Sequence, residues 1–393
     1  MKQLNDFKDS LGIFWDIFLL FAGAAVPGMF SRSSRWLKNR IIRFRLRNTV
    51  DMEHLNILKI CSANPKYEYR DINTRVDDKE LYIGFPEEFI ARVKETDPDF
   101  HIHSDCSFDG SPDFQDIVDR TEIGELKELI AKHRALVADN FVQRANGCLF
   151  NRPKFGIYDI RFDARKGHAE TPAVKIEFFK TDYFTHRVFR SIYNELKAAD
   201  HPIAKLTPDN LNEGLQKYNA FTTSLGINAF VMANAKGGES VIFSKRSVHA
   251  AYAENRLKYN STVMEGVSLT DCDTPNNVSL EQAVYRALME ELGLTRDLLS
   301  KYNTKINYCD FFLEKNYFEI GLTASVTMNS VFEETIRDLP AQDRELEIHK
   351  LHPVRKTKKA LEKFIHKENI YPQGVFTLKM IMAREMIFLN LRK

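Results

Sequence analysis

Three charged side chains that could act together, Arg286, Glu290 and Glu291, lie close together in a segment with helical periodicity. Residues three or four positions apart share one face of a helix, so the arginine is expected one turn before the two carboxylates. Carboxylate oxygens of this kind bind Mg²⁺, and a phosphate bound to that metal could share the site. A solvated helix face is the alternative interpretation of the same cluster.

The helix that positions these groups is predicted over residues 278–294, which read VSLEQAVYRALMEELGL. Apolar residues recur at three- and four-residue steps and define one face: Leu280, Val284, Ala287, Leu288 and Leu292. Glu281 and the three charged residues lie off this face, and Gly293 is placed to end the helix. The pattern therefore predicts one buried face and one charged face.

The segment resembles the core of a Nudix box, whose pattern is G-x5-E-x7-R-E-U-x-E-E-x-G-U with U a bulky aliphatic residue. The residues that match are Arg286, Leu288, Glu290, Glu291, Gly293 and Leu294. Ala287 and Val278 stand where the pattern has its other two glutamates. Gly266 lies 20 residues before Arg286, whereas the pattern places its glycine 14 before, so the turn TDCDTPNNVS is interpreted as an inserted loop. The resemblance implies nucleotide binding, but hydrolysis in this family needs several carboxylates to hold metal and activate water.

The order of predicted elements in residues 211–393 is that of a Nudix-like α/β/α sandwich. Strands are predicted at 227–233, 239–247, 261–266, 306–313, 317–328 and 345–351, with closing helices at 357–366 and 376–389. Thr357 is placed to cap the first of these helices. Residues 49–210 are predicted to form an α+β region of unknown role, with strands at 155–165 and 173–179 and helices at 122–140 and after Asp182. The segment 197–211, which contains two prolines, is the predicted boundary.

A membrane anchor is predicted at the N-terminus. Residues 11–30 carry a single charge, Asp16, and as a helix they span roughly 30 Å, the thickness of the hydrocarbon core. Seven cations follow: Arg32, Arg35, Lys38, Arg40, Arg43, Arg45 and Arg47. By the positive-inside bias, we expect a single pass through a membrane with the C-terminal domain in the cytoplasm. A signal peptide cleaved after Ala24 and a buried core helix are the alternatives.

Composition sets wide bounds on the rest. The 393 residues, 44% hydrophobic, are enough for one or two cores, and a net charge of +2 selects no class of partner. The five cysteines form no CxxC pair, which favours reduced thiols in the cytosol. His101, His103, Asp105 and Cys106 resemble metal ligands, but nothing elsewhere completes a recognisable ligand spacing.

A membrane span, a basic segment and an incomplete Nudix box in this order resemble the transmembrane-Nudix effectors of bacterial CBASS anti-phage systems. In that family a cGAS/DncV-like nucleotidyltransferase makes a cyclic oligonucleotide, which the soluble domain of the effector binds. The resemblance implies that the chain then forms a homo-oligomer and disrupts the inner membrane, which causes abortive infection. It implies a cyclic nucleotide ligand, the lipid bilayer as partner and no catalytic residue.

The predicted ligand-binding residues have two sources. Arg286, Glu290 and Glu291 come from the motif, and Glu290 and Glu291 are the expected ligands of any Mg²⁺. Glu265, Arg246 and Lys245 come from the expected topology alone.

Two other functions remain open on the sequence. The first is a membrane-anchored Nudix hydrolase that cleaves a nucleoside diphosphate derivative with Mg²⁺, with Glu265, Glu333 or Glu334 as its base. The second is an adaptor that uses the fold for protein contacts only.

Overall fold

The computed structural model describes residues 55–60, 73–76, 79–82, 88–93, 117–142, 151–163, 173–250, 255–274, 276–385, 387 and 389. The chain divides into two units, and every described residue belongs to the second, Val50–Lys393. The predicted membrane span at 11–30, the basic segment after it and the cluster from His101 to Cys106 lie outside the described residues. Within the described ranges no helix is long and apolar enough to cross a membrane.

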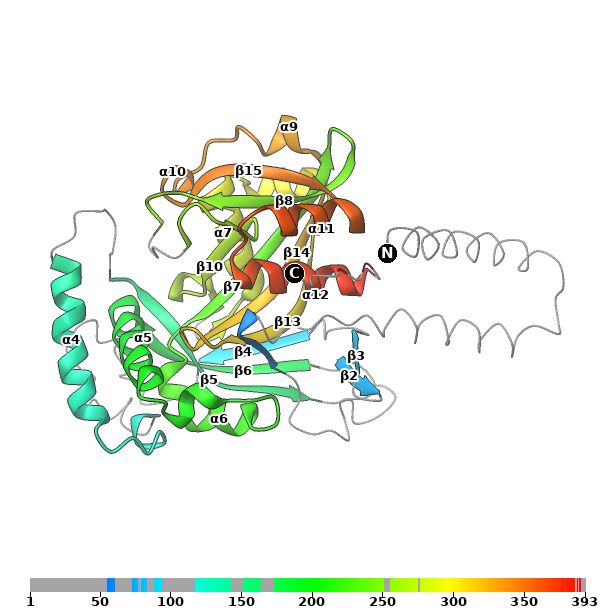
Figure 1. The fold of residues 1–393 in the computed structure, drawn as a ribbon. Coiled ribbons are helices and arrows are strands. Elements are labelled where there is room, and N and C mark those ends of the chain that lie inside the picture. Colours follow the sequence, from blue (N-terminus) through cyan, green and yellow to red (C-terminus); the bar gives the residue numbers. More distant parts are fainter. Residues whose placement is uncertain are drawn as a thin grey trace, which may run out of the picture. The chain divides into compact units, whose positions relative to one another are not determined.

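An eight-stranded sheet lies at the centre of this unit (Figure 1). Its main path runs β1 (Ile57–Ile60), β13 (Lys305–Glu314), β14 (Glu319–Val331), β7 (Leu225–Ala235), β8 (Gly238–Arg246) and β15 (Ile348–Arg355). Off this path, β10 (Val263–Gly266) pairs with β7, and β9 (Tyr259–Asn260) pairs with β8. The β14–β7 pair is parallel, and the other pairs in the sheet are antiparallel.

Helices cover both faces of this sheet, because the side chains of a strand alternate between the two. On β7, Ile227 and Val231 pack into the core that contains helix α7 (Leu280–Leu292). Phe230 and Met232 on the same strand pack into the core of α11 (Lys358–Lys367) and α12 (Pro372–Arg384). The result is the α/β/α layering expected from the sequence.

A second sheet combines three strands from the region before the sandwich with two short strands from the inserted loop. Its strand order is β11 (Cys272–Thr274), β12 (Asn277–Val278), β4 (Glu88–Val93), β6 (Ala173–Asp182) and β5 (Pro153–Asp163). The predicted loop insertion is therefore a small hairpin, β11–β12, that extends this sheet through the pairing of Asn277 with Arg92. A separate pair, β2 (Asn73–Val76) and β3 (Lys79–Tyr82), completes the strands described.

Helices α4 (Leu126–Val142) and α5 (Tyr183–Ala198) pack against each other beside the second sheet. Asp182 caps α5 as predicted, since its side chain accepts the N–H of Thr185 at 2.7 Å. The predicted inward face of α5 is confirmed by four buried side chains: Phe184, Val188, Ile192 and Leu196.

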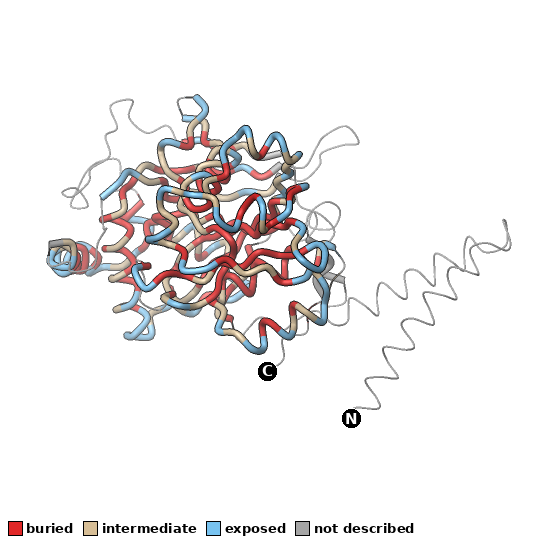
Figure 2. The backbone as a smooth tube through the Cα atoms, turned by 90° about the horizontal axis from the view of Figure 1, so that it is seen from above, coloured by how far each residue is buried: buried red, intermediate tan, exposed pale blue. Residues whose placement is uncertain are grey.

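Both sheets contribute to one continuous hydrophobic core, seen as the red interior of Figure 2. The predicted boundary near residue 210 lies inside this unit. There the chain forms a short 3-10 helix, η2 (Pro202–Lys205), then α6 (Leu211–Lys217) and a second 3-10 turn, η3 (Asn219–Phe221). Ile203, Leu206 and Leu211 from this segment pack into the same core.

Three short helices complete the described elements of the sandwich: α8 (Arg296–Lys301), α9 (Phe332–Thr335) and α10 (Arg344–Glu347). The last of these differs from the predicted strand at 345–351, because β15 starts only at Ile348.

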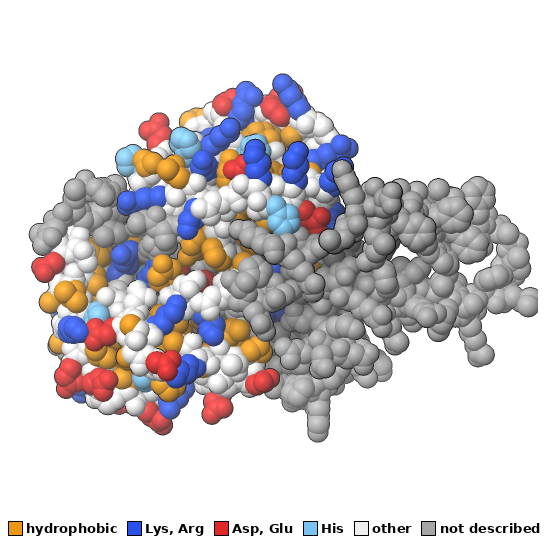
Figure 3. Space-filling model, viewed as in Figure 1, with side chains coloured by type: hydrophobic (Ala, Val, Ile, Leu, Met, Phe, Trp, Pro, Cys, Tyr) orange, Lys and Arg blue, Asp and Glu red, His pale blue; other side chains and the backbone are white. Residues whose placement is uncertain are grey.

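The two closing helices are confirmed with shifted bounds. Thr357 caps α11 as predicted, by accepting the N–H of Ala360. Helix α12 starts at Pro372 rather than at residue 376, because proline suits the first helical position, where no hydrogen bond from its nitrogen is needed. Figure 3 shows Lys and Arg side chains gathered over the face that carries α11 and β15.

Candidate functional site

Helix α7 is held at both ends by the residues that follow and precede it. The side chain of Ser279 caps the N-terminus by accepting the N–H of Gln282 at 3.2 Å. Gly293 ends the helix with a φ of 74°, and a Cβ built there would lie 2.1 Å from the carbonyl oxygen of Pro340. Both the backbone angle and the close approach require glycine, so the predicted C-cap is confirmed.

The predicted apolar face of α7 is fully buried: Leu280, Val284, Ala287, Leu288 and Leu292. Glu291 departs from the prediction, because it is only 2% exposed instead of lying on a charged outer face. Its Oε1 accepts the N–H of Met264 on β10 at 2.9 Å, so the carboxylate ties the helix to the strand beside it. Burial of the carboxyl group raises the pKa of Glu291 to about 8, against the opposing effect of Arg246.

Arg286 is the centre of a dense network rather than a free phosphate ligand. Its Nε and Nη2 donate to the two carboxylate oxygens of Asp271 at 2.8 and 2.9 Å, and Nη2 also donates to the carbonyl of Gly266 at 2.7 Å. Its Nη1 lies 3.2 Å from Glu290 and 3.3 Å from Glu265. The donors of this guanidinium are therefore engaged within the site.

Asp271 is a site residue that the sequence analysis missed, because it lies in the predicted loop insertion. It ends a 3-10 turn, η5 (Leu269–Asp271), where its carboxylate also accepts the N–H of Ser268 at 2.8 Å. It is 1% exposed. The signal was its position five residues after Gly266, one short of the place that the Nudix pattern gives to a glutamate.

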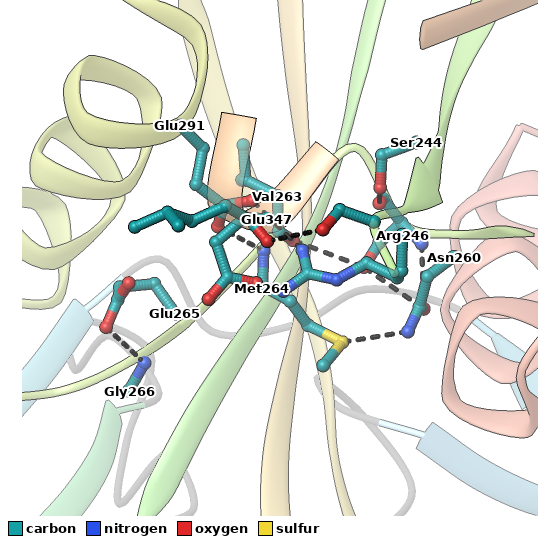
Figure 4. Close-up of polar contacts among 12 residues, drawn as sticks. Ser244, Arg246, Asn260, Val263, Met264, Glu265, Gly266, Glu291 and Glu347 are labelled. Carbon is teal, nitrogen blue, oxygen red and sulfur yellow. Dashed lines mark hydrogen bonds and ion pairs between the residues drawn. The ribbon is translucent and has the colours of Figure 1, made fainter. Parts of the chain in front are cut away.

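Arg246 forms a second network on the other side of Glu291 (Figure 4). Its Nη1 donates to Oε2 of Glu291 at 3.2 Å, and its Nη2 pairs with Glu347, which lies at the end of α10. Arg246 is 5% exposed. One buried guanidinium thus joins β8, α7 and α10.

Lys245 does not join this group, although it was predicted beside Arg246. Adjacent residues of a strand point to opposite faces of the sheet. The ammonium of Lys245 lies over the ring of Tyr259, 5.6 Å from its centroid, and Tyr259 belongs to the core of α11 and α12. The prediction placed Lys245 and Arg246 on the same side of β8, whereas their side chains lie on opposite faces of the sheet.

A pocket of about 210 Å³ opens beside these networks. Its lining residues come from both sheets: Lys154, Tyr183, His186, Ser224, Gly226, Asn228, Arg246, Ala250, Asn255, Met264, Glu265, Gly266, Glu319, Ile320, Gly321, Glu347 and Gln373. Two of the six predicted ligand residues, Arg246 and Glu265, thus line the pocket. Arg286, Glu290 and Glu291 do not line the pocket. They contact it indirectly, because Arg286 binds Glu265 and Glu290, and Glu291 binds Arg246.

Part of the pocket lining comes from the region of unknown role. Lys154 on β5 approaches Gly266 so closely that a Cβ there would lie 2.8 Å from its Nζ. Burial lowers the pKa of Lys154, and burial raises the pKa of Glu265, the residue before Gly266. No sequence pattern marked Lys154, because its role depends on contact between two distant parts of the chain.

His186 from the same region and Glu319 from β14 also line the pocket. Burial lowers the pKa of His186 to about 4, while its Nδ1 bonds Thr223 Oγ1 at 3.1 Å and its Nε2 lies 3.4 Å from Glu319. Burial alone would raise the pKa of Glu319, but Arg190, at 2.6 Å, together with His186 and Lys154 outweighs this and the pKa falls to about 2. His186 is thus held neutral beside a charged carboxylate.

The carboxylates around the pocket do not fit a metal site as arranged here. Within the described part of the chain, no group of three or more His, Cys, Asp or Glu side chains is placed to hold a metal ion. Glu290 pairs with Arg286 and Glu291 pairs with Arg246, so each carboxylate of the predicted Mg²⁺ site is bound to a different guanidinium. The arginines occupy the positions where a cation would neutralise these oxygens.

No protein-family model matches the sequence, and no curated protein matches it. Two of the solved structures that it resembles are described as Nudix proteins. The NUDIX domain of Shewanella oneidensis NrtR, complexed with ADP ribose, is 12% identical, with a TM-score of 0.26 over 41% of this chain and 84% of that chain. A MutT/nudix family protein from Enterococcus faecalis is 14% identical, with a TM-score of 0.24 over 42% and 74%.

A third similar structure is a bifunctional NMN adenylyltransferase/ADP ribose pyrophosphatase from Francisella tularensis, complexed with AMP and a Mn ion. It is 15% identical, with a TM-score of 0.27 over 46% of this chain and 54% of that chain. Each of these three alignments covers less than half of the chain.

Proposed function

We propose that this protein is a membrane-anchored receptor whose Nudix-like domain binds a cyclic nucleotide second messenger and does not cleave it. The observation that supports this most directly is the pairing of Glu290 and Glu291 with two different arginines, Arg286 and Arg246. Nudix-type hydrolysis needs carboxylates that are free to bind metal and activate water. A site whose acids are neutralised by its own side chains retains a polar pocket without that chemistry.

The two motif positions that lack a glutamate also support ligand binding without hydrolysis. Ala287 and Val278 stand where the Nudix pattern has glutamates, and both are buried in the core, 0% and 4% exposed. A carboxylate at either place would be buried among apolar side chains at a large cost in free energy. These positions therefore serve packing in this chain.

Binding is proposed to act through the N-terminal segment. Residues 11–30 are proposed to cross the inner membrane of a bacterium, with the described unit in the cytoplasm. A ligand shifts an assembly equilibrium only through its different affinity for the two states, so the cyclic nucleotide must favour an oligomer of the soluble domains. The tethered spans then meet at high effective concentration and disrupt the membrane, as in the CBASS effectors that the sequence resembles.

The second candidate is a membrane-anchored Nudix hydrolase of nucleoside diphosphate derivatives. One observation favours it: Glu265 lines the pocket and burial raises the pKa of its carboxyl group, as is usual for a general base. Glu333 and Glu334, the other two candidate bases, do not line the pocket. Glu333 instead accepts the N–H of Lys236 at 3.2 Å.

The test titrates the full-length chain with a panel of cyclic di- and trinucleotides and follows growth arrest and dye entry in cells supplied with each. The proposal predicts that one ligand binds and permeabilises cells that express the chain. Arg286→Ala should weaken binding about ten- to a hundredfold, because Gly266 and Glu265 lose the contact that positions them. Failure of every cyclic nucleotide to bind would remove the receptor proposal and leave the hydrolase.

A further inference from the structure

Three residues that line the pocket, Asn228, Asn255 and Arg246, each carry a buried polar atom without a hydrogen bond among the described residues. The atoms are Oδ1 of Asn228, Oδ1 of Asn255 and Nε of Arg246. Their residues are 2%, 4% and 5% exposed. Most buried polar atoms in folded proteins are paired, so three unpaired atoms on residues of one pocket indicate a ligand that supplies the missing donors and acceptor.

The charges of the pocket exclude a phosphate as the best-fitting group. Three carboxylates, from Glu265, Glu319 and Glu347, line it against two cations, Lys154 and Arg246. Arg246 is also already paired with two carboxylates, so its charge is not available to an incoming anion.

We propose that the pocket receives a nucleobase that carries an exocyclic amino group, while the phosphates of the ligand remain outside. The amino group donates to the side-chain oxygens of Asn228 and Asn255, and a ring nitrogen accepts the N–H of Arg246 Nε. This inference rests on the proposed function, which supplies the nucleotide, and it adds which part of the nucleotide enters and which bases are accepted.

The size of the pocket agrees with one base. At about 210 Å³ it is smaller than the roughly 300–1,000 Å³ of pockets that enclose a drug-sized ligand, so it takes one moiety of a cyclic oligonucleotide. Adenine, guanine and cytosine carry the required amino group, whereas uracil and hypoxanthine lack it. Lys154 and His186 make the region before the sandwich part of the binding site.

The experiment measures calorimetric affinities of the full-length chain for matched pairs of ligands. The probes are cyclic di-GMP beside the same molecule with hypoxanthine as its base, and cyclic di-AMP and cyclic tri-AMP, each beside the same molecule with unsubstituted purine as its base, so that only the amino group is removed. In the pair that binds, we expect the member with the amino group to have an affinity at least about tenfold higher than the member without it. Asn228→Ala and Asn255→Ala should each reduce that difference, and the exposed Asn194→Ala should leave it unchanged.

Two results overturn the inference alone. One is equal affinity for both members of a pair, and the other is displacement of the bound ligand by millimolar inorganic phosphate with no effect of the asparagine variants. If no probe binds at all, the proposed receptor function fails together with the inference. Because Oδ1 of Asn228 and of Asn255 makes no hydrogen bond within the described part of the chain, thermal melting should show both variants folded, and either one suffices for the test.

Discussion

Arg286 binds Asp271 through two hydrogen bonds, 2.8 and 2.9 Å long, and thereby joins helix α7 to the turn that follows β10. The same guanidinium holds the carbonyl of Gly266 at 2.7 Å. Gly266 and Glu265 at the end of β10 line the pocket, so Arg286 acts as a positioning residue rather than as a ligand. The arginine of the motif fixes the strand that forms one pocket wall.

Asp271→Asn should destabilise the fold. The substitution replaces a charged acceptor by an amide that places an NH₂ group opposite the guanidinium, so we expect a loss of about 1.5–3 kcal/mol in the free energy of unfolding. Urea denaturation measures it. Asp209→Asn, at an exposed position, is the matched control and should change little. Equal stability of the two variants would contradict a structural role for Asp271.

Arg246→Ala and Lys245→Ala should differ sharply although the residues are neighbours. Loss of Arg246 leaves Glu291 and Glu347 without their partner, and breaking such a buried pair costs about 3–5 kcal/mol. Lys245 contacts only a ring on the other face in the interactions described, so its loss should stay within about 0.5 kcal/mol. Thermal and urea denaturation compare them, and a large effect at Lys245 would contradict the placement of the two side chains.

His186 should make the stability of the chain depend on pH. Its pKa is about 4 in the folded chain against 6.5 in the unfolded chain, so between these values the unfolded chain binds the extra proton. Its contribution to stability is therefore present above pH 6.5 and is lost as the pH falls towards 4, by about 3 kcal/mol in all.

The measurement compares urea denaturation of the chain and of His186→Gln at pH 7 and pH 5. The variant cannot titrate at this position, so it should lose less stability on acidification than the unaltered chain. His366→Gln, at an exposed position, should retain the original pH dependence. An identical pH dependence of His186→Gln and the unaltered chain would show that His186 is not held neutral by burial.

Local patterns predicted the helix that carries the motif because its determinants are close in sequence. The apolar spacing of Leu280 and Leu288 and the glycine at 293 act within a few residues, and the structure confirms them. The caps Asp182 and Thr357 were predicted for the same reason. Proline at residue 372 was interpreted as lying before a helix, although it is also the residue best suited to begin one.

The pocket could not be predicted in this way, because its walls come from residues far apart in the chain. Lys154 and His186 meet Arg246 and Glu265 only through packing of the two sheets on one core. Glu291 shows a second reason. A carboxylate next to the apolar face of a helix is predicted to be exposed. Glu291 is instead buried, and it accepts hydrogen bonds from the backbone N–H of Met264 and from the buried Arg246.

Deleting residues 1–30 should separate binding from toxicity. If the segment acts as the proposed membrane span, the shortened chain keeps its affinity for the cyclic nucleotide and no longer arrests growth or admits dye. Ala24 and Gly28 are small residues four positions apart, a spacing that lets helices approach closely, so Gly28→Leu should lower toxicity while affinity stays near normal. A shortened chain as toxic as the full one would assign the toxicity to a soluble activity of the described unit.

The proposed receptor differs from a hydrolase in what happens to the ligand, and chromatography of that ligand after prolonged incubation tests this most directly. The full-length chain is incubated with the cyclic nucleotide that binds it, and separately with a nucleoside diphosphate derivative, with Mg²⁺ or Mn²⁺ in excess. We predict that both are recovered intact, because Glu290 and Glu291 are bound to Arg286 and Arg246. Turnover that Glu290→Gln or Glu291→Gln abolishes would contradict this account and identify the protein as a hydrolase.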